Sequence, residues 1–170
     1  MPSGARRAIA PILVVEHDDD TRMTLLEILE QEGYAVRAVG DGVSALAALR
    51  VERFRLMLLD LRLPDMSGHE VRRRQLEEER LASVPVIVLT ADNAAFIPGL
   101  PFLRKPFELD ELLERVRTEI DAGERARSRE LLAAMSDVRK QLEKTMNDLD
   151  AIRRGREEVD EAPPSTRRGR

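Results

Sequence analysis

Short apolar runs that alternate with helix-forming stretches constrain the fold of this chain more than any other feature. The runs have the length of β-strands and cover residues 12–15, 34–39, 56–59 and 84–89, with a weaker one at 100–103. Three of them are nearly continuous Val, Ile and Leu, which is typical of strands buried on both faces. Between the runs, apolar residues recur with helical spacing. The pattern predicts an α/β domain with a doubly wound, five-stranded parallel sheet.

One connection between the predicted strands is unusually short. Only nine residues, 91–99, separate the fourth run from the fifth. A crossover between parallel strands usually needs at least about 10 to 12 residues including its helix. We therefore expect the fourth helix of the domain to be shortened or missing. A later helix, closing the domain near residue 121, is predicted by one apolar stripe formed by Leu109, Leu112, Leu113, Val116 and Ile120.

The composition changes after this predicted domain. Charged residues make up 35% of the chain, but residues 121–170 alone contain 12 Lys and Arg and 11 Asp and Glu. Such a charge-dense segment cannot bury much apolar surface, so we expect it to form a single helix rather than a second domain with its own core. The expected organisation is a flexible arm (1–10), the α/β domain (11–121), a helical extension (122–156) and a disordered tail (157–170).

A heptad repeat runs through the helical extension. Its apolar positions are spaced by 4, 3, 4, 3, 4 and 3 residues, at Leu131, Met135, Val138, Leu142, Thr145, Leu149 and Ile152. This spacing predicts the seam of a coiled coil over about three heptads, and therefore a homo-oligomer. Asp148 and Arg153 fall at flanking positions that can pair between chains. The alternative is an amphipathic helix that packs on its own domain or on another partner.

Composition excludes several classes of protein. The chain has no cysteine, which rules out disulfides and thiolate metal sites. No apolar run approaches the roughly 18 residues of a membrane span, and the first run meets Glu16 too early for a signal peptide. A net charge of -4 gives no general case for nucleic acid binding. We expect a cytoplasmic protein that contacts neither membrane nor nucleic acid.

Polar residues follow the predicted strands where a ligand site of such a sheet would lie. Glu16, His17 and Asp18 follow the first strand, while Asp60, Thr90 and Lys105 follow the third, fourth and fifth. A cluster of acids repels itself unless cations neutralise it, and Lys105 with a divalent metal would do so. Carboxylates suit Mg²⁺, and a carboxylate beside Mg²⁺ and an ammonium is a competent phosphoryl acceptor. The pattern predicts phosphoryl transfer onto Asp60.

Four motifs in order resemble the receiver domains of two-component response regulators. They are ILVVEHDDDTR, LMLLDLRLPDMSG, VPVIVLTAD and FLRKPF, and the resemblance covers about residues 11–121. The family's fold implies the strand order 2-1-3-4-5. The resemblance also implies a cis peptide bond between Lys105 and Pro106.

Site roles follow from the same resemblance. Asp60 would be the phosphoacceptor, Thr90 would bind the phosphoryl oxygens and Lys105 would pair with them. Thr90 and Phe102 stand where the family has its switch residues. Mg²⁺ would be held by a set that comprises Glu16, the residue after it (His17), Asp60 and the backbone carbonyl of Arg62.

His17 departs from the family pattern, because it stands where the family has its main metal-binding Asp. An imidazole is a poorer Mg²⁺ ligand than a carboxylate, so the substitution weakens the expected site. Asp18 is the neighbouring alternative ligand. The plainer interpretations are a solvated loop imidazole for His17 and a core-filling aromatic for Phe102.

The expected function is a phosphoacceptor signalling protein rather than an enzyme. A histidine kinase or phosphotransfer protein would donate the phosphoryl group, and a downstream protein partner would read the change. The alternative, favoured by His17, is a degenerate receiver that acts as a phosphorylation-independent scaffold. A phosphatase of the haloacid dehalogenase type also uses a strand-end Asp, but it needs a second Asp two positions later, where this chain has Arg62.

Overall fold

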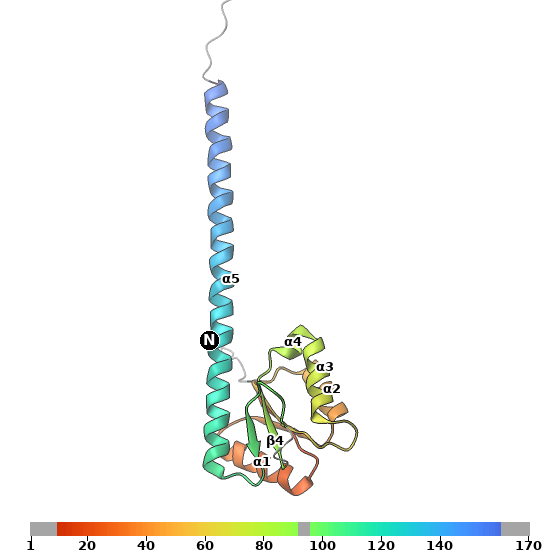
Figure 1. The fold of residues 1–170 in the computed structure, drawn as a ribbon. Helices are drawn as coiled ribbons and strands as arrows, with labels where there is room; N and C mark the ends of the chain where they lie inside the picture. Colours follow the sequence, from red (N-terminus) through yellow and green to blue (C-terminus); the bar gives the residue numbers. More distant parts are fainter. Residues whose placement is uncertain (1–9, 92–95, 161–170) are drawn as a thin grey trace, which may run out of the picture. The chain divides into compact units, whose positions relative to one another are not determined.

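The computed structural model describes residues 10–91 and 96–160, with side chains described up to residue 154. Contacts divide the chain into two units, Met1–Arg125 and Ala126–Arg170. The first contains a sheet of five parallel strands in the order β2-β1-β3-β4-β5, which confirms the predicted fold class and strand order (Figure 1). The strands are β1 (Ile12–Val15), β2 (Val36–Val39), β3 (Leu56–Asp60), β4 (Val86–Thr90) and β5 (Phe102–Arg104).

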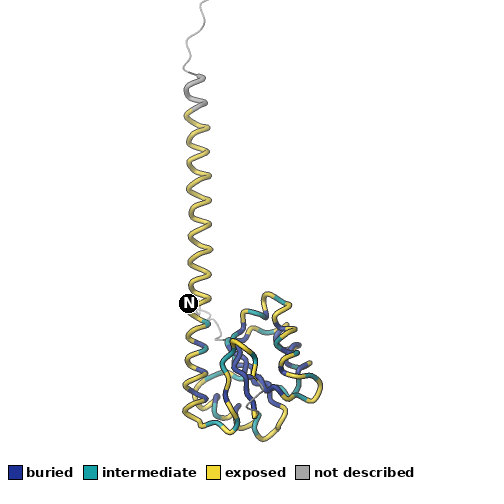
Figure 2. The backbone as a smooth tube through the Cα atoms, in the orientation of Figure 1, coloured by how far each residue is buried: buried dark blue, intermediate teal, exposed yellow. Residues whose placement is uncertain are grey.

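Helices cover both faces of this sheet. They are α1 (Asp19–Gln31), α2 (Gly42–Val51), α3 (Gly68–Glu77), α4 (Glu79–Ala82) and α5 (Leu109–Asp160). In β1, Ile12 and Val14 belong to one apolar cluster with residues of α1 and α5, whereas Leu13 and Val15 belong to a second with residues of α2 and α3. All four are fully buried, and Figure 2 shows buried strands within the sheet. Burial on both faces explains why the strand sequences are continuously apolar.

The connection from β4 to β5 is as compact as its length predicts. Residue 91 and residues 96–101 contain no helix, and α4 lies before β4. The predicted shortening also concerns residues 92–95, which lie outside the described residues. Leu100 packs against the apolar cluster that includes Val86, so the connection itself contributes to covering the sheet.

The C-terminal helix differs from its prediction. Instead of a domain helix ending near residue 121, α5 continues from Leu109 to Asp160, past the predicted limit at residue 156. Gly123 lies within this helix at a position where a larger residue does not fit, because a Cβ there would lie 2.9 Å from the Pro85 side chain. The close approach to Pro85 requires glycine, and the surrounding Ala, Leu, Glu and Arg residues favour helix. Leu109, which the sequence pattern places on the buried stripe, is half-exposed.

No helix in residues 10–91 or 96–160 combines the length and the apolar character needed to cross a bilayer.

Gln75 of α3 connects three segments of the domain. Its buried side-chain amide donates to the carbonyls of Leu81 at 2.8 Å and Val84 at 3.1 Å, and its carbonyl accepts from Arg72 at 2.7 Å. We expect Gln75→Leu to lower the free energy of unfolding by about 1–3 kcal/mol, because buried partners lose their hydrogen bonds. Urea denaturation measures this, and Gln31→Leu, at an exposed position of α1, is the control. Equal stability of both variants would contradict the role of Gln75.

Candidate functional site

Four of the predicted site residues lie at the carboxyl ends of the parallel strands. Glu16 directly follows β1, Asp60 ends β3, Thr90 ends β4 and Lys105 directly follows β5. Glu16, Asp60 and Thr90 are buried. The backbone N–H of Lys105 donates to the carbonyl of Thr90 at 2.7 Å, which joins the last two strand ends. Because β1 and β4 both flank β3, these ends form one edge of the sheet.

Lys105 connects the two buried carboxylates. Its Nζ donates to Asp60 Oδ2 at 3.2 Å and also contacts Glu16 Oε2. The peptide bond between Lys105 and Pro106 is cis, as the family resemblance implied. One ammonium therefore lies between two acids that would otherwise repel each other.

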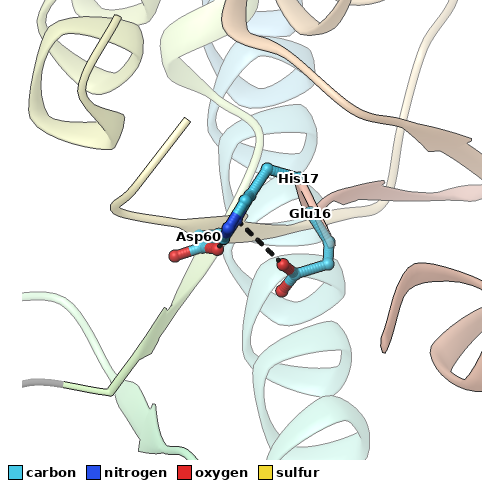
Figure 3. Close-up of side chains that lie close together, drawn as sticks. All are labelled: Glu16, His17 and Asp60. Carbon is cyan, nitrogen blue, oxygen red and sulfur yellow. Dashed lines mark hydrogen bonds and ion pairs between the residues drawn. The ribbon is translucent and has the colours of Figure 1, made fainter. Parts of the chain in front are cut away.

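His17 also contacts both carboxylates (Figure 3). Its Nδ1 lies 2.7 Å from Asp60 Oδ2 and 3.2 Å from Glu16 Oε1. The side chain is 43% exposed, so one part of the imidazole meets solvent while Nδ1 faces the acids. The interpretation of His17 as a purely solvated loop residue therefore does not hold.

Asp18 has a different role from the one that its position suggested. Its Oδ1 accepts from the backbone N–H of Thr21 at 2.8 Å, so it caps the first turn of α1. Hydrogen bonds from the Thr21 side chain and backbone lower the pKa of Asp18. The Asp18 carboxylate thus belongs to the helix cap, while its N–H donates to Glu16 Oε1 at 3.0 Å.

The two buried acids differ in their proton affinity. Burial raises the pKa of Glu16, and the hydrogen bonds from Lys105 and Asp18 offset only part of this effect. Burial also acts to raise the pKa of Asp60. There the Arg62 N–H, 3.0 Å from Asp60 Oδ1, and the charge of Lys105 prevail, so the pKa lies below its usual value. Asp60 is therefore a carboxylate at neutral pH, the form that acts as a nucleophile.

Sequence reasoning did not single out the residues that hold the loops around this site. Arg22 donates to the carbonyls of Glu16 at 2.8 Å and His17 at 3.3 Å, which fixes the loop after β1. Asp65 accepts from the backbone N–H groups of Gly42 and Val43 at 2.9 and 2.8 Å, which ties the loop after β3 to α2. Gly68 leaves no room for a side chain, because a Cβ would lie 2.6 Å from the carbonyl oxygen of Asp60.

Phe102 lies on β5 with half of its surface exposed. The interpretation of Phe102 as core filler is therefore wrong. Its role as a switch aromatic stays a prediction.

Three potential metal ligands lie together at this edge. One ligand atom each of Glu16, His17 and Asp60 lies within 4.8 Å of the others. The two carboxylates fit Mg²⁺, which proteins commonly bind through one or two carboxylates while water fills other positions. The imidazole nitrogen does not add to that fit.

Comparison with known proteins gives one family. The family model of the response regulator receiver domain matches residues 12–117. The transcriptional regulatory protein CrdR of Helicobacter pylori is 41% identical over 113 residues, which are 62% of this chain and 53% of CrdR. The DNA-binding response regulator MtrA of Mycobacterium tuberculosis is 38% identical over 116 residues, 64% of this chain and 50% of MtrA. The chain thus spans about half the length of these relatives.

Solved structures of receiver domains match about two thirds of the chain. The receiver domain of a sensor histidine kinase from Pseudomonas aeruginosa, determined with a magnesium ion in its active site cleft, aligns with a TM-score of 0.63 and 30% identity. The match covers 67% of this chain and 99% of that domain. A CheY-like receiver domain protein from Methanospirillum hungatei aligns with a TM-score of 0.64 and 27% identity, over 70% of this chain and 99% of that protein.

Proposed function

This chain belongs to the response regulator receiver domain family, and from this membership we propose that it accepts a phosphoryl group on Asp60 in a two-component system. One observation carries the proposal. The buried Asp60 carboxylate has a lowered pKa and lies 3.2 Å from the Lys105 ammonium at the end of β3. A desolvated, ionised carboxylate beside a fixed cation is suited to attack phosphorus.

The transfer would proceed by displacement at phosphorus. One carboxylate oxygen of Asp60 forms the new O–P bond, while the bond from phosphorus to the donor atom breaks and its electron pair leaves with the donor. The donor would be a phosphohistidine of a histidine kinase or phosphotransfer protein. Lys105 would pair with the phosphoryl oxygens, and the Thr90 hydroxyl at the end of β4 would donate to one of them.

A divalent ion completes this proposal. Glu16, Asp60 and the carbonyl of Arg62 would hold Mg²⁺, and the ion would supply positive charge next to the phosphoryl oxygens. Phosphorylation would replace the contact between Lys105 and the free Asp60 carboxylate by a contact with the phosphoryl group. Thr90 and the half-exposed Phe102 would then transmit the change from β4 and β5 to a downstream protein partner.

The second unit of the chain would join copies of the chain into a homo-oligomer. The seam residues Leu131, Met135, Val138 and Leu142 are each more than half exposed in a single chain, and Leu149 and Ile152 continue the repeat. Asp148 directly precedes the seam residue Leu149, and Arg153 directly follows the seam residue Ile152. In a parallel coiled coil, these two flanking positions of neighbouring helices lie side by side, so Asp148 of one chain can pair with Arg153 of another. This opposite charge favours a second copy of the chain in parallel orientation. We propose that the extension is a homo-oligomer interface.

The second candidate function is a scaffold that works without phosphorylation. His17 favours it, because Nδ1 lies 2.7 Å from the Asp60 oxygen that also contacts Lys105. An acceptor oxygen held by two neighbours is less accessible to a donor than one held by Lys105 alone. In this case the receiver domains of the oligomer would bind their protein partners whether or not Asp60 is phosphorylated.

Intact-mass spectrometry separates the two functions. We expect incubation with a small acyl-phosphate donor and Mg²⁺ to add one phosphoryl mass to the chain. The same incubation with a chelator should add less, because the ion supports the transfer. No mass gain, even with a cognate kinase, would contradict the phosphoacceptor function and favour the scaffold.

A further inference from the structure

We propose that the metal triad, defined as Glu16, His17 and Asp60, selects a nitrogen-binding divalent transition ion such as Zn²⁺ or Co²⁺ over Mg²⁺. This proposal deepens the proposed function, since it concerns the ion of the same site. It starts from the position of His17, whose Nδ1 faces both acids instead of solvent (Figure 3).

The distance from His17 to Glu16 already fits two ligands of one ion, whereas the distance from His17 to Asp60 has hydrogen-bond length and would have to increase. Metal–ligand bonds of about 2.0–2.2 Å place neighbouring donors about 3.0–3.5 Å apart around a zinc-like ion. Nδ1 of His17 lies 3.2 Å from Glu16 Oε1 and 2.7 Å from Asp60 Oδ2, and the three donors span no more than 4.8 Å. Small side-chain shifts would therefore suffice for one ion to contact all three.

The chemical types of the three ligand atoms determine which metal ion the site favours. An imidazole nitrogen suits Zn²⁺, Ni²⁺ and related ions, whereas Mg²⁺ favours oxygen donors and gives up its water reluctantly. A set of three protein ligands with a further open position is also typical of zinc sites that act on a substrate.

The surroundings keep His17 in the set, although Asp60 Oδ2 would be shared between the ion and the Lys105 ammonium, which lies 3.2 Å away. Arg22 holds the carbonyls of Glu16 and His17, so the loop that carries the imidazole is anchored. Asp18 is occupied by the cap of α1 and does not replace His17. Lys105 contacts Glu16 through Oε2, whereas Nδ1 is nearest to Oε1, so the ion and the ammonium would use different oxygens of Glu16.

Calorimetric titration of the full chain with ZnCl₂ and with MgCl₂ tests the selectivity. We expect His17→Asp to weaken Zn²⁺ binding and tighten Mg²⁺ binding, so that the ratio of the two affinities changes by at least about tenfold. His69→Asp makes the same change at the other histidine, an exposed residue of α3, and should leave the ratio unchanged. An unchanged ratio in His17→Asp would overturn the proposal.

A second measurement locates the ion without any reaction. In nitrogen-15 spectra of the histidine rings, Zn²⁺ should shift the Nδ1 resonance of His17 and leave His69 unaffected. A shift of His69 alone, or of neither histidine at saturating Zn²⁺, would also overturn the proposal. Both measurements use no phosphodonor, so they can fail while Asp60 is still phosphorylated with Mg²⁺, and they can succeed if Asp60 is not an acceptor.

Discussion

Replacing Asp60 by asparagine should reduce phosphoryl incorporation from an acyl-phosphate donor to the background of an unreactive protein. The expected loss is complete because an amide oxygen at this position does not act as the nucleophile that the carboxylate provides. Asparagine has nearly the same shape, so the loop after β3 should keep its structure. Intact-mass spectrometry after incubation with donor and Mg²⁺ measures the effect.

Asp18→Asn is the matched control for this variant. Asp18 lies beside the site but caps α1, and asparagine is an equally good cap. The control should be phosphorylated like the wild type. Equal labelling of Asp60→Asn and wild type would mean that the acceptor lies elsewhere.

Leu142→Glu should convert an oligomeric chain into monomers. In the proposed coiled coil, Leu142 is at the middle of the seam and fills a hole in the neighbouring helix, so glutamate would bury an unpaired charge. The expected cost is several kcal/mol for each chain, enough to abolish assembly at micromolar concentration. Sedimentation velocity measures the change.

Ala151→Glu provides the control for this experiment. Ala151 is exposed and lies one residue before the seam position Ile152, where a glutamate would stay in solvent. This variant should sediment like the wild type. A monomeric wild type would contradict self-association, and it would favour the alternative in which the helix packs on its own domain.

The sheet and most of the site follow from the sequence for a simple physical reason. A strand covered on both faces must be apolar throughout, and β1, β3 and β4 show this directly in their residues. Once the strands are placed in the order 2-1-3-4-5, which the family resemblance implied, the rule that ligands bind beyond their carboxyl ends brings Glu16, Asp60, Thr90 and Lys105 to one edge. The prediction of these four neighbours needed no side-chain geometry.

Contacts that depend on the conformation of loops could not be predicted from the sequence. The distance from His17 to Asp60 depends on the loop that Arg22 and the Asp18 cap hold, and Asp65 reaches α2 from a loop far away in sequence. The change to a charge-rich composition also suggested that the domain helix and the helical extension are separate, whereas α5 continues to Asp160 as one helix. The sequence predicted a boundary near residue 121 because the residues after it cannot form a core. The helix continues past that point because its residues have high helix propensity.

The most direct test of the central claim is to locate the phosphoryl group on the wild-type chain. After incubation with donor and Mg²⁺, borohydride reduces an aspartyl phosphate to homoserine, which peptide mass spectrometry assigns to one residue. The phosphoacceptor function predicts homoserine at Asp60, in the peptide that contains Leu58 and Leu59, and nowhere else. Homoserine at another aspartate, or a phosphoryl group on His17 that resists this reduction, would contradict it.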